Sequence, residues 1–202
     1  MNYSQNNEQE LIFKYFKGFK GTLLDLGAND GITLSNSFAA INKGWKGILV
    51  EASPKTFLEL EKTHKNNKDI QLLNVAVGMF NEKIIFYESG TLLKKGDRSL
   101  VSTIVEEELK RWSGIQFNKI EVDCYNFKTL YEKFNYKTFD LISIDVEGMD
   151  YKVLTQMNLT ELGCKMLIVE FNGKNEADYI SYVKKHNMKL YAKNLENLIF
   201  VV

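Results

Sequence analysis

The chain contains few of the residues that cross-link small domains or bind metals in them. Its 202 residues include two cysteines, Cys124 and Cys164, and their spacing fits neither a zinc knuckle nor a redox Cys-x-x-Cys pair. We therefore expect both thiols to be reduced and structural. No apolar run approaches membrane-spanning length, and the first ten residues carry neither a basic start nor an apolar signal region. We expect a cytoplasmic protein with no membrane partner.

An excess of either charge is also missing. The chain has 26 basic and 26 acidic side chains, so it lacks the general positive field that is typical of nucleic-acid-binding proteins. We expect no nucleic-acid partner and a small-molecule or saccharide substrate. His64 and His186 both lie in lysine-rich stretches, where a solvated helix end is a better account of a histidine than a catalytic base.

Arginine is scarce, and its two positions are close together. Arg98 and Arg111 both lie in an irregular central region, where one interpretation is a clamp for an anionic substrate such as a sugar phosphate or carboxylate. For Arg111, ion pairing with the acidic run 106–108 is the favoured alternative. Residues 88–99 form the longest flexible loop that the pattern indicates, so residues 88–118 are predicted to be a substrate lid or insertion.

The chain does have a regular alternation of apolar runs and segments of helical period. With 45% hydrophobic residues it can bury a sizeable core, so we expect residues 1–202 to form one domain, with an N-terminal helix in residues 1–20 as a lid or brace. A short polar segment, 193–197, separates the last two apolar runs, which are therefore expected to pair as an antiparallel hairpin. The predicted strands are 23–24, 48–50, 70–75, 83–87, 120–123, 139–145, 165–170, 188–192 and 198–202, and the predicted helices are 4–16, 33–43, 53–60, 105–112, 127–134, 151–157 and 177–185.

Residues 23–31 are the most informative segment, because an apolar strand there breaks into a glycine-bounded turn. Gly27 lets the backbone turn without a side chain that would block a ligand. Glu51 ends the next apolar run, where doubly wound folds place an acid that binds ribose hydroxyls. This pattern predicts an adenosine-containing cofactor, although an ordinary turn at a strand end would share the Asp-x-Gly motif.

The glycine spacing discriminates between adenosine cofactors. A dinucleotide fingerprint needs Gly-x-Gly-x-x-Gly, but Asn29 and Asp30 occupy the space of its middle glycine. A loop that carries Asp25 and Asp30 repels a phosphate and suits a cation. S-adenosylmethionine brings both an ammonium and a sulfonium, so it is the predicted cofactor, and NAD is the disfavoured rival.

Four segments carry a likeness to a known family: residues 24–31 (Leu-Asp-Leu-Gly-Ala-Asn-Asp-Gly), 50–51 (Val-Glu), 74–78 (Asn-Val-Ala-Val-Gly) and 144–148 (Ile-Asp-Val-Glu-Gly). With them, nearly the whole chain resembles the FkbM family of S-adenosylmethionine-dependent methyltransferases. The resemblance implies an α/β protein with the Rossmann-like class I methyltransferase fold. Such a fold has a seven-stranded, mostly parallel sheet, helices on both faces, and a C-terminal hairpin that inserts an antiparallel strand. It also implies O-methylation of sugars or polyketide-like natural products.

The resemblance further implies roles for individual residues around the cofactor. Asp30 is included among the predicted cofactor-binding residues because its negative charge suits a cationic cofactor. For Ala76, close packing at a strand end is an equally good account. The predicted cofactor-binding residues are Asp25, Gly27, Asn29, Asp30 and Gly31 around the methionine part, Glu51 on the ribose, and Ala76 beside adenine.

Methyl transfer to a hydroxyl needs a base or a metal that lowers the pKa of the hydroxyl. Ligands of open α/β sheets sit beyond the carboxyl ends of strands, and the candidate catalytic residues there are Asp145, Glu147, Glu170 and Asn172. Asp145 is the leading candidate for the base and Glu147 the second, with capping of the next helix as the alternative. Asp145, Glu170 and Asn172 could together hold Mg²⁺, but a metal-free mechanism is favoured.

These patterns predict an S-adenosylmethionine-dependent O-methyltransferase. Its acceptor is expected to be a hydroxyl of a saccharide, a nucleotide-linked sugar or a related small metabolite. The alternative is a non-catalytic S-adenosylmethionine-binding partner subunit. The pattern carries no prediction of oligomeric state.

Overall fold

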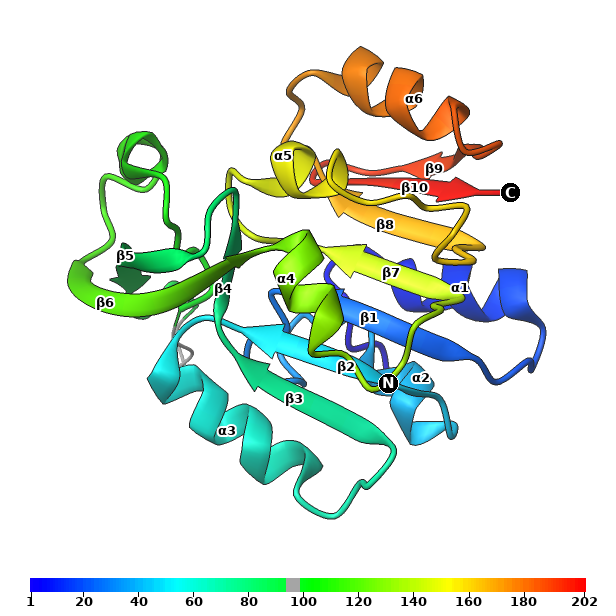
Figure 1. The fold of residues 1–202 in the computed structure, drawn as a ribbon, viewed down its shortest axis with the longest axis horizontal. Coiled ribbons are helices and arrows are strands. Elements are labelled where there is room, and N and C mark those ends of the chain that lie inside the picture. Colours follow the sequence, from blue (N-terminus) through cyan, green and yellow to red (C-terminus); the bar gives the residue numbers. More distant parts are fainter. Residues whose placement is uncertain (94–98) are drawn as a thin grey trace.

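A computed structural model describes residues 1–93 and 99–202, and it is built around one large twisted sheet (Figure 1). The seven strands of this sheet lie in the order β3-β2-β1-β7-β8-β10-β9. Neighbouring strands run parallel except at β10, which is antiparallel to both β8 and β9. This order confirms the predicted mostly parallel sheet with a C-terminal hairpin. The strands are β1 Thr22–Leu26, β2 Lys46–Glu51, β3 Ile70–Asn74, β7 Leu141–Ile144, β8 Met166–Glu170, β9 Lys189–Lys193 and β10 Asn197–Val201.

Helices cover both faces of the large sheet, as predicted. The side chains of α1, α2 and α3 pack with one face, where Ile12, Ala40 and Leu60 meet Leu23. Those of α4, α5 and α6 pack with the opposite face, where Leu24 belongs to the other core cluster. Alternate residues of β1 therefore point to opposite cores, which explains why this strand is apolar on both sides. The helices are α1 Glu8–Phe16, α2 Phe38–Asn42, α3 Pro54–His64, α4 Phe127–Glu132, α5 Asp150–Leu154 and α6 Glu176–Lys184, with a 3₁₀ helix η1 at Glu106–Lys110.

Several helices depart from the expectation, and the predicted helix 105–112 is only the short 3₁₀ helix η1. The predicted helix 33–43 shortens to α2, because Leu34 adopts φ 54° and the Ser35 hydroxyl accepts hydrogen bonds from the backbone N–H groups of Ser37 and Phe38. Such local side-chain bonds compete with helix formation. In α6, Tyr179 is buried as expected, but Ile180 is 37% exposed, so its predicted inward orientation is wrong. None of the helices in the described part of the chain has the length and apolarity that crossing a bilayer demands.

A second, three-stranded sheet stands beside the large one and was not foreseen as a unit. It contains β4 Ala76–Gly78, β5 Glu82–Ser89 and β6 Phe117–Asn126 in the order β4-β6-β5. Figure 1 shows β5 and β6 projecting away from the main body. The predicted insertion 88–118 thus begins and ends inside strands. Arg98, half of the proposed anion clamp, lies outside the described residues.

Candidate active site

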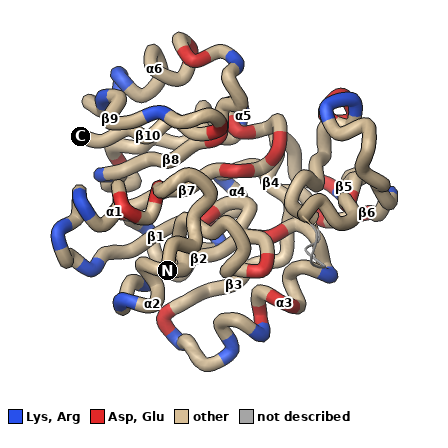
Figure 2. The backbone as a smooth tube through the Cα atoms, turned by 180° about the vertical axis from the view of Figure 1, so that it is seen from behind, with Lys and Arg blue, Asp and Glu red and all other residues tan. Residues whose placement is uncertain are grey.

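A cavity of about 180 Å³ opens at the carboxyl edge of the large sheet. It is lined by the ends of β1, β2, β7 and β8 and covered by residues of the segment 99–112. Figure 2 shows acidic residues gathered near α5, where β7 and β8 end. Among the lining residues that the structure describes, Arg111 is the one basic side chain. The acidic ones are Asp25, Glu51, Asp145, Glu147, Glu170 and Glu196.

Gly27 is required by close packing of the backbone where β1 leaves the sheet. Its φ is 90°, and a Cβ atom added there would lie 1.7 Å from the carbonyl oxygen of Asp145. The Gly27 and Ala28 N–H groups both donate to the Val50 carbonyl at 3.0 Å. The turn is thereby held against β2 and β7 together, so this glycine lines the cavity and also lets three strand ends meet.

Glu51 is buried at the end of β2, and its two oxygens hold neighbouring backbone. Oε2 accepts a hydrogen bond from the Asn29 N–H at 2.9 Å, and Oε1 accepts one from the Ser53 N–H at 2.7 Å. Burial raises the pKa of Glu51 to about 7, although these bonds favour the ionised form. Ser53 caps α3 by accepting a bond from the Thr56 N–H. Glu51 therefore links the β1 turn, the start of α3 and the cavity.

Asp25 lies at the other side of the same turn. The Ser37 hydroxyl donates to its Oδ2 at 2.6 Å, and burial raises the pKa of Asp25 to about 6. Beside it, Asn36 donates to the Ser143 hydroxyl at 3.2 Å, while its buried Oδ1 accepts no hydrogen bond from any residue that the structure describes. Sequence reasoning missed Asn36 and Ser37, because the segment around them was predicted to be helical. The polar run Thr33 to Ser37 is the signal that could have marked them.

Two predicted cofactor residues do not line the cavity. Asp30 instead holds its own turn, since its Oδ1 accepts bonds from the N–H groups of Ile32 and Thr33 at 2.8 and 2.7 Å. Gly31, at φ 78°, faces α3, where a Cβ atom would lie 2.7 Å from Leu60 and 2.8 Å from the ring of His64. Both residues thus shape the loop that carries Asn29, and neither reaches the space that a ligand would occupy.

An apolar wall lies beside Glu51, where the Val75 N–H donates to the Glu51 carbonyl at 3.1 Å. It contains Val75, Ala76 and Val77 at the end of β3 and in β4, together with Phe86 of β5 and Ile104. Next to it, a Cβ atom at Gly78 would lie 2.6 Å from the Cys124 sulfur, so that glycine serves close packing. The second sheet therefore supplies one side of the cavity, and Ala76, the residue predicted to lie beside adenine, is among its lining residues.

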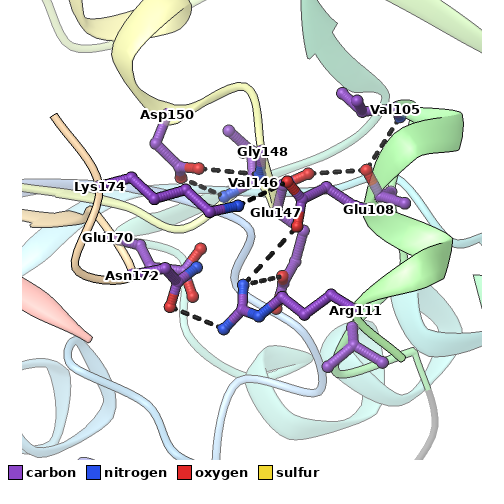
Figure 3. Close-up of polar contacts among 12 residues, drawn as sticks. Val105, Glu108, Arg111, Val146, Glu147, Gly148, Asp150, Glu170, Asn172 and Lys174 are labelled. Atoms are coloured by element: carbon purple, nitrogen blue, oxygen red, sulfur yellow. Dashed lines mark hydrogen bonds and ion pairs between the residues drawn. The ribbon is translucent and has the colours of Figure 1, made fainter. Parts of the chain in front are cut away.

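Carboxyl groups crowd the far side of the cavity, beyond β7 and β8 (Figure 3). Burial, and then repulsion by Glu147, raises the pKa of Asp145, while burial and the charge of Glu170 raise the pKa of Glu147. The pKa of Glu170 is raised by burial and by Asp145. Among the described residues, Glu147 Oε2 and Glu170 Oε2 are buried and accept no hydrogen bond. The four predicted catalytic residues include these three carboxyls.

Asp150 adds a further carboxyl that sequence reasoning missed. Single oxygens of Asp145, Asp150 and Glu170 lie within 4.8 Å of one another, a spacing that a metal ion could bridge. Asp150, however, accepts backbone N–H bonds with both oxygens, from Val146 at 2.8 Å and from Gly148 at 3.0 Å. It therefore holds the tight turn that follows β7, and burial raises its pKa to about 6.

Arg111, directly after η1, reaches this cluster of carboxyl groups. Its Nη2 donates to Asn172 Oδ1 at 2.8 Å, and its Nη1 lies 3.8 Å from both Glu108 and Glu147. The ion pair with Glu108 confirms the alternative expected for this arginine. Asn172 itself, the fourth predicted catalytic residue, lies beside Glu170 and is engaged by the guanidinium rather than directed into the cavity.

The segment that carries Arg111 is tied down over the turn after β7. The Thr103 hydroxyl donates to the Glu147 carbonyl at 2.6 Å, and Lys174 reaches Glu108 at 3.3 Å. Trp112 lines the cavity next to Arg111, whose guanidinium lies 4.8 Å from the indole ring. Sequence reasoning placed this segment as a lid but did not predict which side chains it would present.

Comparisons with known proteins identify the family of the chain and its fold. The profile of the family described as Methyltransferase FkbM domain matches residues 25–194. None of the curated proteins matches the chain. The chain aligns with FkbM methyltransferase from Methylobacillus flagellatus KT at a TM-score of 0.57 and 12% identity, over 92% of this chain and 44% of that one. It therefore spans less than half the length of that protein.

Two further solved structures share the fold. A putative RNA methyltransferase from Pyrococcus horikoshii has a TM-score of 0.52 and 12% identity, with 96% of this chain and 81% of that chain covered. The putative methyltransferase yhhF from Escherichia coli has a TM-score of 0.51 and 10% identity, with 100% and 88% covered. At these identities the likeness concerns the fold alone.

Proposed function

Because this chain belongs to the FkbM methyltransferase family, we propose that it is an S-adenosylmethionine-dependent O-methyltransferase that acts on a hydroxyl of a saccharide or related small metabolite. The family implies both methyl transfer and S-adenosylmethionine binding. It favours an enzyme over a non-catalytic partner subunit. The observation that carries the proposal is a cavity with Glu51 and an apolar wall on one side and a cluster of carboxyl groups on the other.

The near side of the cavity suits an adenosyl donor. Each Glu51 oxygen already accepts one backbone bond and retains a lone pair for a ribose hydroxyl. The apolar wall around Ala76 suits the flat face of adenine. Asp25 and the unpartnered Oδ1 of Asn36 suit the ammonium of the methionine part. We assign these roles to them, together with Gly27 and Asn29 as the floor of the turn.

The far side suits the acceptor. S-adenosylmethionine, when bound, would supply the methyl group: a bond would form between the acceptor's hydroxyl oxygen and the methyl carbon as the C–S bond breaks. The electron pair of the C–S bond would stay on sulfur, with S-adenosylhomocysteine as the leaving group. We assign Asp145 as the base that takes the hydroxyl proton, since a raised pKa makes a carboxylate a stronger base near neutral pH. Glu147 is the second candidate, and Glu170 orients the acceptor, while Asn172 holds Arg111 beside them.

A metal-free mechanism is part of the proposal. In the predicted set of Asp145, Glu170 and Asn172, the Oδ1 of Asn172 already accepts a bond from Arg111. The Arg111 guanidinium, 3.8 Å from Glu147, competes with a divalent cation for the carboxylate oxygens of this cluster. Proton removal by Asp145 does not require a Lewis acid.

The charge of the cavity also supports a small acceptor over a nucleic acid. One of the solved structures with this fold is titled a putative RNA methyltransferase. Here, however, the described lining residues include six acidic side chains and one basic side chain. An RNA backbone would have to approach the reacting atoms against that repulsion.

Substitution of Asp145 by asparagine tests the proposed base. Release of S-adenosylhomocysteine is measured with a panel of saccharide acceptors, and we expect kcat to fall by about 10²–10⁴-fold, with an unchanged Kd for S-adenosylhomocysteine. Asp123→Asn, an exposed aspartate of β6, is the matched control and should behave as the wild type. Full turnover by Asp145→Asn would show that another group removes the proton. Absence of S-adenosylhomocysteine binding by the wild type would refute the proposed function itself.

A further inference from the structure

Two buried carboxylate oxygens on the acceptor side accept no hydrogen bond from the described residues, although Arg111 Nη1 lies 3.8 Å from the one in Glu147. They are Oε2 of Glu147 and Oε2 of Glu170, whose residues are 7% and 5% exposed. A buried polar atom without a partner is costly, and native proteins keep few of them outside binding sites. Both residues line the cavity. Their free oxygens therefore indicate a ligand that donates hydrogen bonds.

The negative charge around these oxygens favours a positively charged hydrogen-bond donor over a neutral one. Asp145 and Asp150 lie beside Glu147 and Glu170, and each carboxyl raises the pKa of a neighbour. Arg111 is the one basic side chain in the described lining, and it contacts Glu147 only at 3.8 Å. The four carboxyls together thus have fewer positive charges beside them than negative charges of their own.

Arg111 is the cation that the structure already places beside these carboxyls. It is an N–H donor, and it bonds directly to the Asn172 oxygen at 2.8 Å beside Glu170. A protonated amine would offer the same chemistry, since an ammonium presents three N–H donors and one positive charge. Such an ammonium could donate to the unpartnered Oε2 of Glu170.

We propose, on the basis of the proposed function, that the acceptor carries a protonated amine that binds between Glu147 and Glu170 while a neighbouring hydroxyl faces Asp145. An amino sugar is the substrate class that fits. An anionic acceptor, such as a nucleotide-linked sugar or a sugar phosphate, does not fit, because it would meet an excess of carboxyls. The interpretation of Arg111 as an anion clamp is therefore replaced, since that side chain is already engaged by acidic and amide oxygens.

A divalent metal ion is the rival ligand for the same oxygens. Asp150 would have to serve as one of its ligands, but both Asp150 oxygens accept backbone bonds that hold the turn after β7. The Asn172 oxygen, another potential metal ligand, is taken by Arg111. These contacts favour an N–H donor over a metal ion.

Sinefungin provides a probe of known structure for this subsite. It resembles S-adenosylmethionine but carries an amine where the transferable methyl group would be, so its ammonium is directed at the acceptor side. Calorimetry compares its Kd with that of S-adenosylhomocysteine, which has no such group. We expect sinefungin to bind at least tenfold more tightly to the wild type, and this ratio to fall below threefold in Glu170→Gln. Glu147→Gln is the second variant, and Glu161→Gln, at an exposed position, is the control that keeps the wild-type ratio.

The outcomes separate this inference from the proposed function. If S-adenosylhomocysteine binds but sinefungin binds no more tightly, the cationic subsite is refuted and the methyltransferase remains. If Mg²⁺ alone titrates the S-adenosylhomocysteine-loaded protein, and Glu170→Gln abolishes that binding, the site belongs to a metal. Turnover with amino sugars that exceeds turnover with their N-acetyl counterparts supports the inference, and turnover confined to neutral or acidic saccharides overturns it.

Discussion

The ionisation of Glu51 should make cofactor affinity depend on pH near neutrality. Burial raises the pKa of this carboxyl to about 7 from its ordinary value of 4.5. Only the ionised form has both oxygens free to accept hydrogen bonds from ribose hydroxyls. Lowering the pH from 8 to 6 therefore removes the binding form of the free protein while the cofactor's own hydroxyls stay unchanged.

The size of the effect follows from the pKa. With a pKa of about 7, roughly nine-tenths of the Glu51 carboxyls are ionised at pH 8 and roughly one-tenth at pH 6. The Kd for S-adenosylhomocysteine should accordingly be about tenfold weaker at pH 6 than at pH 8. The same carboxyl lowers the stability of the free protein as the pH rises, because the unfolded chain ionises near 4.5 and the folded chain only near 7.

Isothermal titration with S-adenosylhomocysteine at pH 6, 7 and 8 measures this dependence. Glu51→Gln should flatten it to about twofold, the remainder that Asp25, with a pKa of about 6, can supply. Glutamine has one carbonyl oxygen for two backbone donors, so this variant also loses about 1–3 kcal/mol of stability, which thermal unfolding would detect. A wild-type Kd that is equal at pH 6 and 8, or a tenfold change that persists in Glu51→Gln, would refute the reasoning.

Three further predictions concern other parts of the site and its supports. Gly27→Ala should destabilise the protein by more than about 3 kcal/mol, because its Cβ would overlap the Asp145 carbonyl oxygen; a Tm within a few degrees of the wild type would contradict this. Glu8→Ala should cost about 2–4 kcal/mol in denaturant unfolding, since Asn194 and Asn197 both donate to the fully buried Glu8 carboxylate; Glu10→Ala is the control in the same helix. Exhaustive chelation should leave turnover unchanged, whereas a loss that Mg²⁺ restores would favour the metal site.

The centre of the large sheet was predictable from sequence because its strands there are apolar on both faces. In β1, Leu23 and Leu24 are fully buried toward opposite cores, and every residue of β8 is buried. Such runs identify central strands without knowledge of their partners. The hairpin of β9 and β10 followed from its short polar connection. These features depend on local composition, which the sequence displays directly.

The second sheet and the start of α2 depended on contacts that a local pattern does not contain. β4 pairs with β6 although Ala76 and Cys124 are far apart in sequence, so its existence depends on tertiary context. Around Ser35, side-chain hydrogen bonds to the backbone replaced the first helical turn. Helical spacing of apolar residues could not reveal that competition.

The residues of the site likewise fall into two classes: those whose place followed from the sequence, and those whose place depends on tertiary packing. Glu51 and Asp145 were predictable because strand ends in doubly wound sheets converge on the ligand. Asp150 and Trp112 were not, since one faces inward only through the tight turn after β7 and the other arrives on the segment that covers the cavity. Residues carried by strands can thus be inferred from position alone, whereas residues carried by covering segments require the packing of those segments.

The charge of the cavity shows why composition was a poor guide to the acceptor. The chain as a whole is neutral, and that balance made an anionic substrate bound by arginine as reasonable as any other. The structure separates the charges, because acidic side chains line the cavity while most lysines lie on outer helices and loops (Figure 2). A ligand responds to the field inside the cavity, where carboxyls outnumber the single described arginine. The acceptor's charge therefore has to be argued from that placement, and the placement favours a cation.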